Sequence, residues 1–231
     1  MSKLKVYLLF ALILVFILGV ISQRNVLACE FVEYLDYSEI APNIFASSSF
    51  DSAQNKNILS VINLGKSRVD NAFGDTISSP IVIIAATEDD ASTFGSNAYG
   101  SAILTPFGQC IIFGPKGQNI DVIAHEYTHA EVSFRLGWLT HYFNMPIWFN
   151  EGIALLVDYR EPYLLDNIDI SPDEINTVKE MGADFFSGKD VLKNYQAARL
   201  AVESIDKSQL YDNLEKIKQG ETINDVFALK N

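Results

Sequence analysis

The hydrophobic positions of the chain recur at helical spacing in several long stretches. Residues 51–73 predict an amphipathic helix, whose start Asp51 or Ser52 can cap. Residues 119–136 predict a second helix, which Gly137 ends. A third helix is predicted after a loop that spans residues 138–146. The predicted helices that follow this loop cover residues 148–159, 172–181, 189–204, 208–218 and 221–229.

Short apolar runs between turn residues predict a small sheet between the first two helices. Residues 81–86 read IVIIAA, a β-branched run that is typical of a buried strand. Residues 101–104 and 110–113 predict a hairpin, and the preceding residues 88–100 predict a loop or a short helix. The fold class expected from this order is α+β, with a small mixed β-sheet and helices followed by an all-helical C-terminal half.

The first 28 residues differ from the rest of the chain. Two lysines precede an unbroken apolar run, residues 6–21, which is typical of a signal peptide or an N-terminal membrane anchor. The VLAC stretch that follows suits cleavage before Cys29, and it also resembles a lipoprotein box in which Cys29 would be acylated. Every alternative predicts that residues 29–231 form one extracytoplasmic domain, either membrane-anchored or secreted.

Charge and cysteine content narrow the class of protein further. The net charge is −12, and the first 28 residues carry three basic and no acidic side chains, which leaves −15 on the remainder. Such an acidic surface repels nucleic acid, so no nucleic-acid partner is expected. The two cysteines, Cys29 and Cys110, can pair in an oxidising compartment, but the pattern favours Cys110 as a buried thiol in a strand.

Candidate chemistry begins at residues 125–129, which read HEYTH and hold two of the three histidines. Residues four apart share one face of a helix, so His125 and His129 can bind one cation. Glu126 beside them can act as general base toward a zinc-activated water. The residues alone leave the third protein ligand open between His141 in the loop and Glu151 on the next predicted helix.

HEYTH together with WFNEGIA, residues 148–154, resembles the gluzincin zinc metallopeptidases, and in particular short bacterial peptidase MA-like domains. The resemblance covers about residues 50–229. It implies a thermolysin-like catalytic domain with one Zn²⁺ per chain, and it implies that Glu151 completes the ligand set. Asn150 would help to fix the ligand geometry. Asp158, expected two helical turns after Glu151 on the same face, would orient a histidine ligand or remain a solvated surface acid.

The resemblance also implies a role for Tyr195. The stretch NYQAARLAVESI, from Asn194, is similar to a family segment whose tyrosine donates a hydrogen bond to the oxyanion of the intermediate. Tyr195 would take that role or would merely pack. Arg199, one turn further on, would bind a substrate carboxylate or, as the pattern favours, pair with a surface acid.

The expected function is hydrolysis of peptide bonds in a peptide or protein substrate. In the gluzincins an edge strand binds the substrate backbone, and residues 98–104 or 110–113 are the candidates here. The GAMEN motif of the aminopeptidases is absent from the sequence, which favours an endopeptidase. The alternatives are a non-catalytic extracytoplasmic module with bound zinc that serves in binding or assembly, and a metal hydrolase with a non-peptide substrate.

Overall fold

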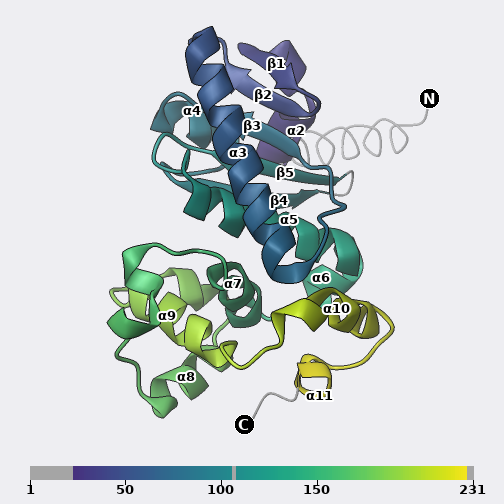
Figure 1. Cartoon of the computed structure of the whole chain (residues 1–231), viewed down its shortest axis with the longest axis vertical. Helices are drawn as coiled ribbons and strands as arrows, with labels where there is room; N and C mark the ends of the chain where they lie inside the picture. Colours follow the sequence, from purple (N-terminus) through teal and green to yellow (C-terminus); the bar gives the residue numbers. More distant parts are fainter. Residues whose placement is uncertain (1–22, 106–107, 228–231) are drawn as a thin grey trace, which may run out of the picture.

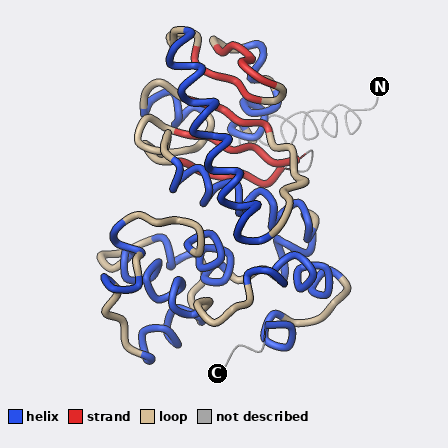
Figure 2. The backbone as a smooth tube through the Cα atoms, viewed as in Figure 1, coloured by secondary structure: helices blue, strands red, loops and turns tan. Residues whose placement is uncertain are grey.

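The computed structural model describes residues 23–105 and 108–227. The apolar run expected to target the chain, residues 6–21, lies outside these ranges. In Figure 1 the β-sheet occupies the upper half of the molecule, and helices make up the lower half. The tube in Figure 2 shows the same division, with all strands confined to the upper half.

The sheet has five strands in the spatial order β1-β2-β3-β5-β4. The pairs β2–β3 and β3–β5 are parallel, whereas β1–β2 and β5–β4 are antiparallel, so the expected mixed sheet is confirmed. Strand β4 has a neighbour on one side only and is therefore an edge strand. The strands are β1 Tyr37–Ala41, β2 Ile44–Ser47, β3 Ile81–Ile84, β4 Gly100–Thr105 and β5 Gly108–Phe113.

The hairpin of β1 and β2 was not among the predicted elements. Its turn contains Asn43, whose φ of 62° lies in the left-handed region that asparagine tolerates better than most residues. All five residues of β1 are exposed or half-buried, so this strand lacks the apolar alternation by which a strand is recognised in a sequence.

Helices cover both faces of the sheet. Because side chains alternate along each strand, neighbouring residues of one strand join the cores on opposite faces. Val82 and Ile84 of β3 join the core beneath α3 (Ser52–Phe73) and α5 (Ile120–Leu136), whereas Ile83 joins a smaller core beneath α2 (Arg24–Glu30) and α4 (Glu88–Thr93). Helix α3 begins with a capping box, in which the Asp51 side chain accepts hydrogen bonds from the backbone of residues 53 and 54.

Helices α3 and α5 pack in close contact through a glycine. A Cβ added to Gly65 of α3 would lie 2.4 Å from Cγ2 of Ile123. The absence of a side chain at this position lets the two backbones approach each other. It therefore sets the depth at which α5, the helix with the HEYTH residues, lies against α3 (Figure 1).

A disulfide bond joins Cys29 of α2 to Cys110 of β5 across the smaller core. The expectation that Cys110 is a free buried thiol is therefore wrong. The sequence could not decide the pairing, because the 81 positions that separate the two cysteines say nothing about their distance in space. This bond uses the Cys29 sulfur, which a thioether-linked lipid would also need, so the two modifications exclude each other.

The C-terminal half is entirely helical, as expected, with two differences in detail. A helix, α6, forms where a loop was predicted, and α7 ends at Leu155 rather than near residue 159. Short 3₁₀ turns connect several of the helices. The helices are α6 Trp138–Asn144, α7 Ile147–Leu155, α8 Pro172–Lys179, α9 Val191–Ala201, α10 Leu210–Lys218 and α11 Ile223–Phe227.

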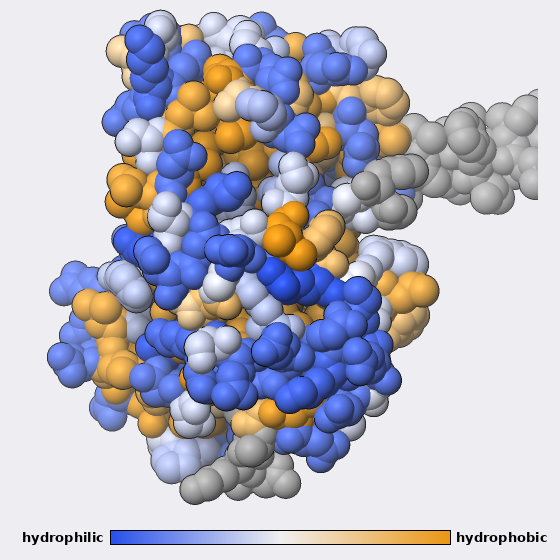
Figure 3. All heavy atoms as spheres, turned by 45° about the vertical axis from the view of Figure 1, so that its right-hand side comes forward, coloured by the Kyte–Doolittle hydropathy of each residue, from blue (hydrophilic) through white to orange (hydrophobic). Residues whose placement is uncertain are grey.

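The surface in Figure 3 is hydrophilic over most of the helical half, and its apolar areas are separated from one another. Within residues 23–105 and 108–227, no helix is both long enough and apolar enough to cross a lipid bilayer.

Candidate metal centre

Helix α5 brings the two histidines of HEYTH together. The Asn119 side chain caps the helix by accepting a hydrogen bond from the backbone N–H of Val122, which fixes the helical phase of the residues that follow. His125 and His129 therefore lie one turn apart on one side of the helix, with ring centroids 4.8 Å apart. Their Nε2 atoms are 3.1 Å from each other, so both rings point at one position.

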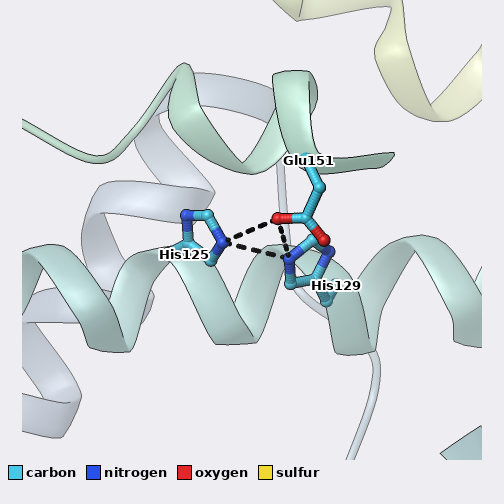
Figure 4. A group of neighbouring side chains, drawn as sticks. All are labelled: His125, His129 and Glu151. Atoms are coloured by element: carbon cyan, nitrogen blue, oxygen red, sulfur yellow. Dashed lines mark hydrogen bonds and ion pairs between the residues drawn. The ribbon is translucent and has the colours of Figure 1, made fainter. Parts of the chain in front are cut away.

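Glu151 reaches the same position from α7. Its Oε2 atom lies 3.5 Å from Nε2 of His125 and 3.5 Å from Nε2 of His129. Figure 4 shows the glutamate extending from its own helix toward the two rings on α5. The structure thus brings together the three residues that the sequence singled out as ligands.

The next residue, Gly152, explains how α7 comes close enough. A Cβ at this position would lie 2.5 Å from the backbone oxygen of Ala198 on α9. Only a residue without a side chain lets α7 pack this tightly between α5 and α9, and the position of Glu151 depends on that packing.

The donor set fits a tetrahedral metal ion. Ligand atoms at about 2.0–2.1 Å from zinc in a tetrahedron are about 3.3 Å from one another. The three donor atoms here are separated by 3.1, 3.5 and 3.5 Å. Two imidazole nitrogens and one carboxylate oxygen, all largely buried, can hold a metal ion in this arrangement.

The carboxylate of Asp158 orients the first histidine. Its Oδ2 atom is 3.3 Å from Nδ1 of His125, which is the contact that would keep a ring proton on Nδ1 and leave the Nε2 lone pair for a cation. Asp158 does not lie on the face of α7 that the sequence suggested, because the helix has already ended at Leu155. The segment that follows α7, rather than the helix itself, brings the Asp158 carboxylate to His125.

Arg160 holds this carboxylate in turn. Its Nε donates to both oxygens of Asp158, at 2.9 and 3.0 Å, and its Nη2 contacts Oδ2 as well. Burial alone would raise the pKa of Asp158, but the bonds from Arg160 and His125 hold that pKa well below its ordinary value. The guanidinium also lies over the ring of Tyr163, 5.1 Å from its centroid. Sequence reasoning missed Arg160, although its place two residues after an implied orienting carboxylate was a usable signal.

Glu126 lies beside the three ligands and is itself buried. Burial raises the pKa of its carboxyl, and the charges of His125 and His129 act against that rise. Burial would also raise the pKa of Glu151, but its interactions with the adjacent His129 and His125 outweigh burial and lower that pKa to about 2. The two glutamates thus have environments that suit different roles, one as a base and one as an ionised ligand.

A cavity of about 310 Å³ opens over these residues and runs along strand β4. Residues 100–104 of β4 line one wall, while His125, Glu126 and Glu151 lie on the other side. Because β4 is the edge strand, one side of its backbone is open to this cavity. Of the two substrate strands considered, residues 110–113 are unsuitable, since β5 pairs with β3 and β4 on its two sides.

Tyr195 of α9 lines the same cavity. Its ring contacts those of Phe185, Phe186 and Tyr163, with centroids 5.2, 6.4 and 6.1 Å away. Burial raises the pKa of Tyr195 well above its ordinary value, and the nearby charge of Glu151 adds to the rise. The hydroxyl therefore keeps its proton and remains a hydrogen-bond donor near the metal ligands.

His141 lines the cavity from α6 but does not belong to the group of three ligands. Burial, together with the charge of His129, lowers its pKa to about 4, so its ring is neutral. Asn150 also lines the cavity, and no described group donates a hydrogen bond to its buried Oδ1 atom. Arg199 pairs with Glu203, which lies just after the end of α9, in agreement with the prediction that it pairs with an acid.

The chain was compared with models of protein families, with curated proteins and with solved structures, and no match was found in any of the three.

Proposed function

We propose that the chain is a zinc-dependent endopeptidase of the gluzincin type, with a thermolysin-like arrangement of α5 and α7. The observation that carries the proposal is the convergence of His125, His129 and Glu151 on one point beside a buried glutamate. The resemblance of HEYTH and WFNEGIA to that family supports it further. A site that is only structural usually has four protein ligands, whereas three leave one position of the ion open for chemistry.

His125, His129 and Glu151 would hold the zinc ion, which when bound supplies Lewis acidity for the activation of water and of a carbonyl group. Glu126 accepts a proton from the attacking water and later returns it to the leaving amine. Asp158 keeps the proton of His125 on Nδ1 throughout. The Tyr195 hydroxyl donates a hydrogen bond to the oxyanion that develops from the substrate carbonyl.

The substrate class follows from the edge strand. An extended peptide can pair with the open side of β4 by adding a strand to the sheet, which places its backbone over Glu126 and the metal ligands. Recognition of this kind uses main-chain groups, so it suits the interior of a peptide or protein and tolerates varied side chains. The disulfide supports an extracytoplasmic location, since such bonds persist in oxidising compartments.

The test compares the full chain with Glu126→Gln, with zinc content and cleavage of a diverse peptide mixture measured on both. We expect equal zinc, near one ion per chain, and cleavage by the wild type alone. The loss should be about 10²–10⁴-fold, the usual contribution of a general base. A matched control is Glu88→Gln, which makes the same change at an exposed position of α4 and should leave cleavage unchanged.

The contrary outcomes are equally clear. Zinc in both proteins with cleavage in neither would replace the peptidase by a zinc-bound binding or assembly module, or by a hydrolase of non-peptide substrates. The absence of zinc from both would overturn the metal centre itself. A chelator should abolish cleavage by the wild type, and added zinc should restore it.

A further inference from the structure

Helix α6 exposes a continuous group of large apolar side chains beside the cavity. We call this group, together with Phe134 at the end of α5, the α6 patch. The exposed fractions of its α6 members are 46% for Trp138, 58% for Leu139, 70% for Tyr142 and 74% for Phe143. The rings contact one another: Trp138 stacks on Tyr142 at 6.4 Å, and Tyr142 meets Phe143 edge-on at 5.0 Å.

The core of the protein does not account for this helix. None of the seven residues of α6 is buried. A helix this short is not stable in water without an apolar face packed against something. Contiguous exposed apolar side chains of this kind usually mark a surface that another body covers.

The residue composition of the α6 patch indicates what kind of surface covers it. The chain has 29 acidic residues, yet none occurs between Glu131 and Glu151, a stretch that contains the whole of α6. Tryptophan and tyrosine among apolar residues, in a stretch without acids, form the composition that is enriched where proteins meet the headgroup region of a bilayer.

The position of the patch agrees with this. The apolar run of residues 6–21 is separated from the start of α2 at Arg24 by two residues, which span at most about 10 Å. If this run remains uncleaved as an anchor, the bilayer that holds it is close to α2. The far end of α2 lies at the end of β4, where Thr105 donates a hydrogen bond to Glu30 at 3.2 Å. Leu104, the preceding residue of β4, lines the same cavity as His141 of α6. Figure 1 places α2 and α6 on the same side of the molecule.

We propose that the α6 patch is a membrane-contact surface that lies in the headgroup region of a lipid bilayer. It is a second contact, separate from the N-terminal apolar run, and it fixes the orientation of the fold on the bilayer. Because His141 of the same helix lines the cavity, the cavity mouth faces the bilayer surface. Chain segments that emerge from the membrane are then the nearest peptides.

The chain's tryptophans provide the test. It has two, of which Trp138 is exposed in the patch and Trp148 is 4% exposed in the core. The full chain is reconstituted into phosphatidylcholine vesicles, with ordinary lipid or with lipid brominated near the headgroup, which quenches tryptophan on contact. We expect loss of emission in brominated vesicles for the wild type and no such loss for Trp138→Phe. Equal quenching of both proteins, or quenching of neither, would overturn the proposal.

A second pair of variants keeps Trp138 in place. Leu139→Glu combined with Phe143→Glu should reduce the quenching, whereas Leu192→Glu at an exposed position of α9 should not. All variants keep the N-terminal run, so a difference between them reports on α6 alone. An emission shift that follows protein density rather than lipid bromination would assign the patch to a second copy of the chain and would overturn the membrane contact. The readout involves no peptide cleavage, so its outcome is independent of the proposed peptidase activity.

Discussion

Asp158 Oδ2 lies 3.3 Å from Nδ1 of His125, so a carboxylate from the segment after α7 sets the direction in which a ligand on α5 points. Arg160 fixes that carboxylate through both of its oxygens. Arg160, Asp158 and His125 thus form a chain of contacts, in which only His125 would touch a bound metal ion.

Replacing Asp158 by Asn should weaken zinc binding by about 10–100-fold, the usual effect of losing a carboxylate behind a histidine ligand. The amide can no longer fix the ring with a negative charge, so the tautomer that presents Nε2 is less favoured. Competition with a chelator measures the affinity. Asp166→Asn, an exposed change in the 3₁₀ turn Leu165–Asn167, is the control. Equal affinity in all three proteins would contradict the orienting role.

Tyr195→Phe should lower kcat by about 10²–10³-fold, as expected when one donor to the oxyanion is removed. Zinc content should not change, because the hydroxyl is not in the ligand group. Stability should change little, since the ring and its contacts with Phe185 and Tyr163 remain. Steady-state kinetics on a peptide found in the cleavage test decide this. Tyr34→Phe, at an exposed position, should behave as wild type, and so should Tyr195→Phe if that tyrosine only packs.

Gly152→Ala should destabilise the fold by about 1–3 kcal/mol, the range for an extra methyl group in a packed interior. The new Cβ would lie 2.5 Å from the Ala198 oxygen and 2.9 Å from Cγ1 of Val202, so α7 must move away from α9. Glu151 moves with it, and zinc affinity should fall in parallel. Urea unfolding checks the first effect. Gly108→Ala is the control, because nothing lies within 4 Å of a Cβ there.

Two glutamates on α5 should give opposite results. Glu131 is fully buried, and its carboxylate accepts hydrogen bonds from the backbone N–H groups of Ile77 and Ser78 and from Arg135. Glu131→Gln should therefore cost about 1.5–3 kcal/mol of stability, the range for hydrogen bonds to a charged group. Glu126→Gln should abolish cleavage and leave the urea midpoint nearly unchanged. Loss of stability in both variants would mean that Glu126 is structural as well.

Removing the disulfide should cost about 2–5 kcal/mol of stability. The bond closes a long loop between Cys29 and Cys110, so its loss frees the unfolded chain and loosens α2 from the sheet. A double replacement by Ser should show this in urea unfolding, and reductant should lower the wild type to the same midpoint. A reductant effect on the double variant would point to a cause other than this bond.

The grouping of His125, His129 and Glu151 could be predicted from the sequence because it rests on local rules. The spacing of His125 and His129 is a property of any helix, and the glutamate of WFNEGIA needs only a neighbouring helix to reach them. Asp158 was selected for a helical geometry that it does not have, since α7 ends three residues earlier. Its contact with His125 depends on the turn after α7, which the sequence pattern does not encode.

The missed features depend on contacts that are distant in sequence. Cys29 and Cys110 meet only because α2 packs on the face of the sheet that carries Ile83 and the smaller core. Helix α6 was taken for a loop because its apolar residues follow no buried face, and its exposure confirms that no such face exists within α6. The predicted core helices α3 and α5, by contrast, have continuous apolar sides and appear close to their expected bounds.

The Cys29–Cys110 bond also has a mechanical consequence. A tension applied through the chain ahead of α2 passes at Cys29 directly to β5, which lies next to the edge strand of the cavity. The covalent ring between the two cysteines, which includes β1, β2 and β3, carries none of that load. If the chain were stretched from its two ends, the helices after β5 would extend while this ring stayed closed. The residues between Cys29 and Cys110 would extend only after a reducing agent had broken the disulfide.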